Sequence, residues 1–540
     1  MPAVLPACDI GVIRSTRGSA PCMPSSRPWV IAAASLGSGM AFLDSTVMNV
    51  ALPAVQAQLG ASVQEVQWSY GAFALVLSAL ILVGGTLGDR FGRRRLFVIG
   101  AAIFGAASLW CALVPVPGQL VAARAVQGVG GALLVPASLA IVGASFEGKQ
   151  RARAIGAWGA LSGLAMAVGP VLGGLLVEYV SWRAAFLMAP AMAVVAIPIA
   201  LSHVPESRDP EARRLDLAGA ILATIGLAGV VYALIESSAR GFGDARVLAV
   251  LVLGLISLSA FVLVEQHARD PMVPPSLFRS KSFTGVNLVT LLFYMALTGS
   301  LFFLPFLMMQ VHGYSAFVAG SVFLPFVAMA LLIGRFSGRI STRFGARVPL
   351  IVASLALAAG LLLFALPGAD HGSYWTAFFP AMVVQGFGMA LAITPMTTAA
   401  LGSVEGEHSG MASGVNNAVT RVAGLLAVAV LGAFIYGAFS LSLDARMERM
   451  DMPGDVRSAM EAAKADLGAA EAPEGVDART EARIERAIDE SFVAGFRAVM
   501  FASAGLALAS ALVAALFISD QRVAPSGRDS ILQVGAGDRV

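Results

Sequence analysis

Two charged residues stand inside long apolar runs of this sequence, where an ionised group is costly. Asp44 lies in the run 29–50, and Arg124 lies in the run 119–143. A carboxylate at the centre of a bilayer costs at least about 2.5–3.5 kcal/mol, so such residues usually face a cavity and serve function. At about 1.5 Å of rise per residue, Asp44 is expected roughly 12 Å and Arg124 roughly 7 Å below the outer surface. These depths and opposite charges predict an ion pair whose carboxylate exchanges a proton; a fixed structural bond is the alternative.

A glycine-containing loop could let two helices approach closely. The loop 85–95 contains Gly85, Asp89, Arg90, Gly92 and Arg93. Glycine permits tight turns, and Asp89 can cap a helix or pair with an arginine across an interface. We therefore interpret the segment as a conformational-switch loop. A plain topology signal is the alternative for its arginines.

The apolar run 154–177 carries a second glycine-rich segment, with Gly169, Pro170, Gly173 and Gly174. Small residues at helical spacing allow helix backbones to approach each other. A proline inside a helix removes one hydrogen bond and bends the helix. The segment predicts a bent helix packed tightly on a neighbour, and packing alone is the alternative to a functional role.

The composition of the chain defines the elements that must position these residues. Of its 540 residues, 57% are hydrophobic and 13% charged, against about 45–50% and about 25% in soluble domains. A soluble chain of this length would form several domains, and this one lacks the charge for their water-facing surfaces. The net charge of +3 is too small to indicate a polyanionic partner. These values exclude a soluble enzyme and a nucleic-acid-binding protein.

Cysteine and histidine are too few to indicate a metal centre or a disulfide framework. The cysteines are Cys8, Cys22 and Cys111, and the five histidines are scattered singly. The sequence also contains no phosphate-binding Gly-x-x-x-x-Gly-Lys-Ser/Thr loop. We therefore expect no metal, no cofactor and no enzymatic activity.

The remaining class is an all-α polytopic membrane protein. A membrane-spanning helix needs about 20 mostly apolar residues, because each backbone amide must be satisfied within the helix. Fourteen runs meet this requirement: 29–50, 68–87, 96–114, 119–143, 154–177, 184–203, 217–237, 247–265, 284–306, 317–337, 348–366, 376–400, 411–437 and 497–518.

An internal repeat divides these runs into two halves. The segment 89–94 has a counterpart at 342–347, and 126–130 has one at 384–388. We therefore expect an N-terminal six-helix bundle at 29–203 and a C-terminal six-helix bundle at 284–518, with two inserted helices at 217–265. Two related bundles with a site at their interface are an architecture of secondary transporters.

Basic residues predict the orientation of the chain. With the N-terminal tail inside, the inner segments hold 22 Lys and Arg residues and the short outer loops hold 3, as the positive-inside rule requires. Both tails, 1–28 and 519–540, are therefore expected in the cytoplasm. The segment 438–496, which holds thirteen acidic residues, is expected to be an extracytoplasmic loop that forms a solvated cap. A partner-binding domain is the alternative.

Polar and aromatic residues of the apolar runs could line a substrate cavity. Aromatic faces suit large apolar cations. Packing against other helices or exposure to lipid is the alternative for each candidate. The candidates are Asn49, Tyr70, Phe73, Gln127, Asn287, Tyr294, Phe302 and Arg421, together with Phe303 and Phe323.

The motifs together resemble the fourteen-span drug:proton antiporter branch of the major facilitator superfamily. The loop 85–95 resembles the superfamily signature between spans two and three. The segment 120–130 resembles the span-four signature whose arginine, here Arg124, is linked to proton coupling. The segments 169–174 and 43–53 resemble the antiporter signature of span five and the first-span signature of this branch.

The second half departs from these signatures. Thr342 stands where the first half has Asp89, and Met382 stands where it has Arg124. The coupling chemistry is therefore expected in the N-terminal half. The resemblance covers essentially residues 29–518 and implies the major facilitator fold.

The resemblance implies a proton-coupled exporter, or drug:proton antiporter, that expels hydrophobic or cationic toxic compounds by alternating access. A selective exporter of one metabolite or antibiotic is the alternative. The implied partners are small-molecule substrates, protons and the lipid bilayer, with no nucleic acid; accessory export proteins are an open alternative in a two-membrane cell envelope. The implied location is the plasma membrane, or the inner membrane of a bacterial cell.

Overall fold

The computed structural model describes residues 13–14, 26–209, 216–268, 271–366, 374–404, 409–450, 454–470, 472–473 and 476–519. Among these residues, fourteen helices are long and apolar enough to cross a membrane. The all-α polytopic fold is therefore confirmed. Most of the two expected tails lies outside the described residues.

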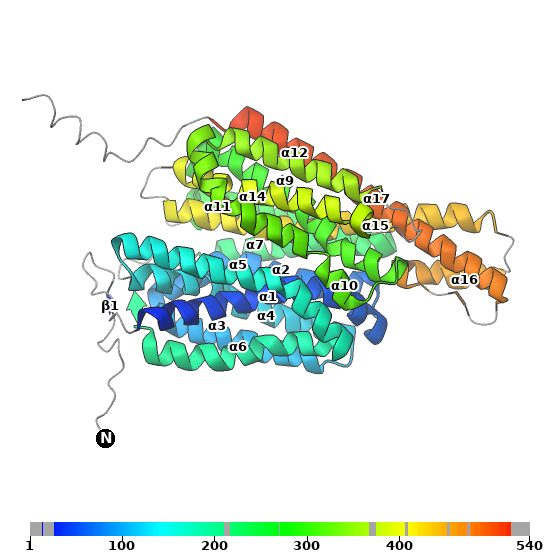
Figure 1. Cartoon of the computed structure of the whole chain (residues 1–540), viewed down its shortest axis with the longest axis horizontal. Coiled ribbons are helices and arrows are strands. Elements are labelled where there is room, and N and C mark those ends of the chain that lie inside the picture. Colours follow the sequence, from blue (N-terminus) through cyan, green and yellow to red (C-terminus); the bar gives the residue numbers. More distant parts are fainter. Residues whose placement is uncertain are drawn as a thin grey trace, which may run out of the picture.

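The first bundle contains six helices that pack around a common core (Figure 1). Serine and proline residues begin several of these helices, and glycine ends α1, where Gly60 adopts a φ of 59°. A left-handed residue at this place is a common helix terminator. The helices are α1 (Arg27–Leu59), α2 (Val63–Phe91), α3 (Arg93–Leu113), α4 (Pro117–Ser145), α5 (Gly148–Tyr179) and α6 (Trp182–His203).

Two further helices stand between the bundles in sequence. They are α7 (Leu217–Arg240) and α8 (Ala245–His267), which pack on each other. α7 also contacts the two bundles, where Val231 and Ile235 pack with Leu75 of the first and Leu425 of the second. The inserted pair thus covers one side of the boundary between the bundles.

The second bundle is less regular than the first. The ninth span of the chain ends in a π-helical turn, and the tenth span is broken into two helices. A two-residue parallel pair, β1 (Ile13–Arg14) with β2 (Ser207–Arg208), lies outside the bundles. The remaining elements are η1 (Pro275–Arg279), α9 (Lys281–Phe306), η2 (Leu307–Val311), α10 (Ala316–Ser321), α11 (Leu324–Phe344), α12 (Arg347–Phe364), α13 (Tyr374–Ala377), α14 (Phe379–Gly402), α15 (Ser409–Met447), α16 (Gly454–Ala463), η4 (Lys464–Ala469) and α17 (Ala478–Phe517).

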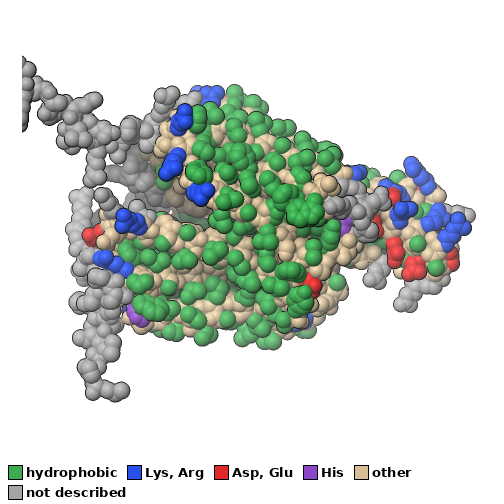
Figure 2. Space-filling view, in the orientation of Figure 1, with side chains coloured by type: hydrophobic (Ala, Val, Ile, Leu, Met, Phe, Trp, Pro, Cys, Tyr) green, Lys and Arg blue, Asp and Glu red, His purple; other side chains and the backbone are tan. Residues whose placement is uncertain are grey.

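The cap is formed by helices that continue out of the membrane region (Figure 1). The expected loop 438–496 is shorter in the structure, because α15 runs to Met447 and α17 begins at Ala478. Ion pairs hold the cap together: Lys464 pairs with Asp444 and Glu461, and Arg446 pairs with Glu490. Figure 2 shows mixed charges on the cap, basic side chains at the opposite end and a hydrophobic surface between them.

The two bundles meet at the cap end. α10 packs closely on α5 there, and the contact weakens along α11 towards the opposite end. Gln310 Nε2 of η2 donates to Gln56 Oε1 of α1 at 3.0 Å, and Gln56 Nε2 donates to the carbonyl of Asp466 in η4 at 3.0 Å. The cap segment therefore closes over the boundary between the bundles.

The middle of the boundary stays accessible from the opposite end. Tyr70 of α2 and Arg421 of α15 are only half-buried although helices surround them. Towards the basic end, Leu161 and Leu164 of α5 and Leu331 of α11 are exposed. α5 and α11 therefore lie apart towards the basic end, and the space between the bundles beside Tyr70 and Arg421 is the central cavity.

Candidate functional site

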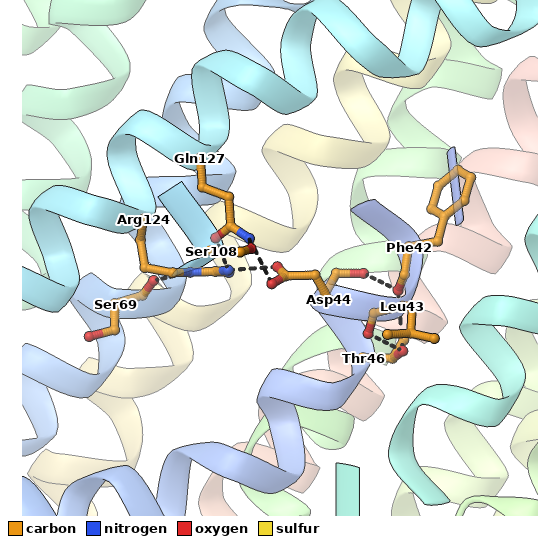
Figure 3. Close-up of polar contacts among 9 residues, drawn as sticks. Phe42, Leu43, Asp44, Thr46, Ser69, Ser108, Arg124 and Gln127 are labelled. Carbon is orange, nitrogen blue, oxygen red and sulfur yellow. Dashed lines mark hydrogen bonds and ion pairs between the residues drawn. The ribbon is translucent and has the colours of Figure 1, made fainter. Parts of the chain in front are cut away.

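The structure brings Asp44 and Arg124 together across two helices (Figure 3). Arg124 of α4 donates through Nη1 to Asp44 Oδ2 of α1 at 2.6 Å. Arg124 is fully buried and Asp44 is 6% exposed. Gln127, one turn further along α4, donates through Nε2 to Asp44 Oδ1 at 2.9 Å. Both carboxylate oxygens of Asp44 are therefore held by α4.

Further groups fix Arg124 in its pocket. Its Nε donates to the carbonyl of Ser69 at 3.1 Å, and its Nη1 also donates to Gln127 Oε1 at 2.6 Å. The guanidinium carbon lies 4.5 Å from the centre of the Phe73 ring, a cation–π contact. Gln127 Nε2 also donates to Ser108 Oγ at 2.6 Å. The charge pair is thus part of a connected network on α1, α2, α3 and α4.

α1 is longer than the apolar run that the sequence indicates. The run was expected to end near residue 50, but α1 continues to Leu59 with Pro53 inside it. Fifteen residues separate Asp44 from that end, which corresponds to about 22 Å of helix. Asp44 therefore lies near the middle of α1, and its depth of roughly 12 Å below the membrane surface stays a prediction.

The glycines of α5 lie against α1 and α10. A Cβ at Gly173 would lie 3.0 Å from Val47 Cγ1, and one at Gly169 would run into the Thr46 side chain. Both contacts are within one turn of Asp44. On the next face, a Cβ at Gly174 would lie 2.9 Å from Phe317 Cα of α10. α5 thus joins the helix of Asp44 to the closed contact between the bundles.

Pro170 takes part in the same contact from the other side. A Cβ on Gly320 of α10 would run into the Pro170 carbonyl oxygen and lie 3.5 Å from Gly174 Cα. Glycine is needed on both helices because the two backbones approach this closely. The glycines and proline singled out in the sequence therefore meet at the boundary between the bundles.

The predicted switch loop is a turn between α2 and α3. Gly92 adopts a φ of 117°, which only glycine adopts readily. Arg93 donates to Asp89 Oδ1 at 2.8 Å, and Arg90 lies over the ring of Phe91. A Cβ at Gly85 would be 3.7 Å from Pro136 of α4. Asp89 thus pairs within its own loop in this structure.

Glu206 is a residue of this loop region that the sequence reasoning missed. Its Oε1 accepts the Arg94 amide at 3.1 Å and its Oε2 accepts the Arg95 amide at 3.3 Å, at the start of α3. Acidic groups are favourable at helix N-termini. Its side chain is 6% exposed. The signal was a single acid that follows Pro205 directly after span six.

The predicted cavity residues separate into two groups. Phe73, Gln127, Asn287 and Phe302 are buried in contacts between helices, and so are Phe303 and Phe323. Asn287, for instance, accepts a hydrogen bond from Asn416 Nδ2 at 3.2 Å within the second bundle. Asn49, Tyr70, Tyr294 and Arg421 are half-buried. In this conformation only the second group is accessible from the cavity.

Two six-helix bundles that meet at one end, part at the other and bury a charge pair beside their boundary define a secondary membrane transporter. The sequence model of the Major Facilitator Superfamily matches residues 34–428. The chain belongs to the Major Facilitator Superfamily, and it is a multi-pass membrane protein.

Several relatives share about a third of the residues of this chain over most of its length. The puromycin resistance protein pur8 of Streptomyces alboniger is 38% identical over 429 residues, which cover 78% of this chain and 84% of the relative. The multidrug resistance protein Stp of Mycobacterium tuberculosis is 34% identical over 77% of both chains. The tetracenomycin C resistance and export protein of Streptomyces glaucescens is 30% identical over 90% of this chain and 91% of its own length.

Solved structures share the fold at low identity. A bacterial homologue of the human lysosomal transporter Spinster, in an inward-facing and unoccupied conformation, has a TM-score of 0.59 and 17% identity. The match covers 92% of this chain and 98% of that one. A peptide transporter in complex with sulfate also has a TM-score of 0.59, at 12% identity. These likenesses extend the superfamily fold over nearly the whole chain.

Proposed function

We propose that this protein is a proton-driven exporter of toxic small molecules that works by alternating access. The observation that carries the proposal is the buried Asp44–Arg124 pair, which lies one helical turn from the glycine contacts of α5. The names of the relatives, which include antibiotic resistance and export proteins, support the same activity.

Asp44 acts as the proton carrier in this proposal. In the conformation described here the carboxylate is ionised and paired with Arg124, and the cavity opens at the basic end. In the opposite conformation a proton from the cap side neutralises Asp44 and removes most of its attraction to Arg124. Release of that proton at the basic end restores the pair, and a substrate binds there.

The helix contacts transmit this change to the cap end. Weakening of the pair frees α1 to shift relative to α4. α5 moves with α1, because the two helices are in direct contact at Gly169 and Gly173. Gly174 and Gly320 join α5 to α10 at the contact that keeps the cap end closed in the conformation described here. The charge state of Asp44 therefore biases the equilibrium between the open and the closed cap end.

The basic end faces the cytoplasm in this proposal. Both tails and the loop with Arg90 and Arg93 then lie inside, and the cap lies outside, as the positive-inside rule requires. The membrane is the plasma membrane, or the inner membrane of a bacterial cell. Each proton that enters then contributes about 2.3 kcal/mol per 100 mV of membrane potential. Accessory export proteins remain an open alternative.

Flux in proteoliposomes of the purified full-length protein tests the proposal. An imposed proton gradient, acidic on the cap side, should drive puromycin or ethidium towards the acidic side. A protonophore should abolish the accumulation, and empty liposomes are the control. Transport that is unchanged by the protonophore would refute proton coupling. A screen across compounds separates a broad exporter from one that is selective for a single metabolite or antibiotic.

A further inference from the structure

Arg421 places a second positive charge in the central cavity. It lies on α15 of the second bundle, and its guanidinium carbon is 5.5 Å from the centre of the Phe42 ring on α1. The residue therefore reaches across the boundary between the bundles, close to the helix that carries Asp44. Unlike Arg124, it is only half-buried.

Arg421 has no acidic partner among the carboxylates that the structure describes. Asp44 is held through both oxygens by Arg124 and Gln127. The other acids within the spans, among them Glu178, Glu236 and Glu265, lie near helix ends. A guanidinium that is partly removed from water normally pairs with an anion. The cavity thus holds a cation whose counter-ion the described residues do not supply.

The charges of the cavity do not cancel. Asp44 and Arg124 sum to zero, so Arg421 leaves one net positive charge. The neighbouring groups are phenols and rings: Arg421 interacts electrostatically with Tyr70 and Tyr294. The ring of Tyr70 lies 5.3 Å from that of Phe302. The wall beside the cation is therefore aromatic and uncharged.

The helices beside the route into the cavity also carry positive charge. α11 carries Arg335, Arg339 and Arg343 at intervals of four residues, and all three are exposed. Residues 151–168 of α5, on the facing wall, carry Arg151 and Arg153 and no acidic residue. Such a surface raises the local concentration of anions.

We propose that the cavity binds aromatic compounds that carry an acidic group, and that Arg421 is the residue that binds this group. The carboxylate, sulfonate or phenolate of the compound takes the place of the missing counter-ion, and its rings lie against Tyr70 and Tyr294. The inference rests on the proposed export function and adds acidic aromatic compounds to its substrates. Guanidinium–anion hydrogen bonds are among the stronger ones in proteins, so the acidic group should decide affinity.

Two dyes with the same ring system test the proposal. 8-Anilinonaphthalene-1-sulfonate carries a sulfonate, and N-phenyl-1-naphthylamine lacks it. Binding is measured by fluorescence titration of the full-length protein in nanodiscs, with empty nanodiscs subtracted. The wild type should bind the sulfonate more tightly. Arg421→Met should weaken sulfonate binding about tenfold or more and change binding of the neutral dye less than twofold.

Two further variants control for folding and for surface charge. Arg421→Lys keeps the charge and should retain most of the preference for the sulfonate. Arg246→Met removes an exposed arginine at the start of α8 and should behave as the wild type. If Arg421→Met weakens the binding of both dyes equally, Arg421 has a packing role and the proposal is overturned. Failure of the wild type to prefer the sulfonate would also overturn it.

The dye-binding experiment and the flux experiment can succeed or fail independently of each other. Protonophore-sensitive flux of puromycin or ethidium, without an Arg421-dependent preference for the sulfonate dye, would support the exporter function and refute the anion site. An Arg421-dependent preference for the sulfonate dye without proton-coupled flux would support the anion site and refute the exporter function.

Discussion

Gly174 provides the most direct test of how the cap end is held closed. A methyl group at this position would lie 2.9 Å from Phe317 Cα and still closer to the carbonyl of Ala316. Overpacking of this kind costs about 1–3 kcal/mol. The cost falls only on the conformation in which α5 and α10 touch. Since about 1.4 kcal/mol is a factor of ten, Gly174→Ala should shift the equilibrium roughly 5- to 150-fold towards opening at the cap end.

Gly163→Ala is the matched control on the same helix. A Cβ at Gly163 meets no atom within 4 Å, and both variants gain the same helix propensity, about 1 kcal/mol. Hydrogen exchange measured by mass spectrometry reports opening through the amides of α10. These amides should exchange faster in Gly174→Ala than in Gly163→Ala or the wild type. Equal exchange in both variants would show that this contact does not hold the cap end closed.

Three further predictions concern other parts of the fold. Glu206→Gln should lower the melting temperature and the transport rate, because each charge-assisted bond to an amide is worth about 1.5–3 kcal/mol. Glu236→Gln, which weakens only a pair with Arg240 one turn along the same helix, should change neither in the same assays. Gln56→Ala removes two bonds of about 1 kcal/mol each between α1, η2 and η4, so hydrogen exchange of residues 464–469 should increase, and unchanged exchange would contradict the assignment. Hydrogen bonds from Thr480 and from the backbone amides lower the pKa of Asp477 below its ordinary value of 3.8. The ionised carboxylate of Asp477 therefore stabilises the start of α17 above about pH 4, and this stabilisation is lost as the pH falls further. Hydrogen exchange of the first α17 amides, corrected for its intrinsic pH dependence, should rise only below about pH 4.

The sequence predicted the membrane class, the fourteen spans and the meeting of Asp44 with Arg124. These features follow from the hydropathy of long segments and from the cost of charge in a bilayer, which are local properties. The ends of the helices were harder to predict from the sequence. Residues 51–59 and 438–447 continue α1 and α15 because they keep helix-compatible residues beyond the apolar run.

The split among the cavity candidates could not be predicted from the sequence. Phe302 and Tyr294 are both aromatic residues of α9, yet Phe302 is buried and Tyr294 is half-buried. The difference depends on which face of α9 turns towards the boundary and on the conformation of the transporter. Glu206 was missed for a related reason, since its partners are amides at the start of α3, more than 100 residues earlier.

Substrate-driven proton release from proteoliposomes tests the central role of Asp44. Asp44→Asn keeps the size and shape of the side chain and one of its two acceptor oxygens, but it removes the carboxylate that takes up and releases the proton. Addition of substrate should release protons from the wild type and none from Asp44→Asn. Exchange of labelled for unlabelled substrate in the absence of a gradient should persist in the variant, which shows that it is folded and binds. Proton release by Asp44→Asn at the wild-type level would show that Asp44 is not the proton carrier.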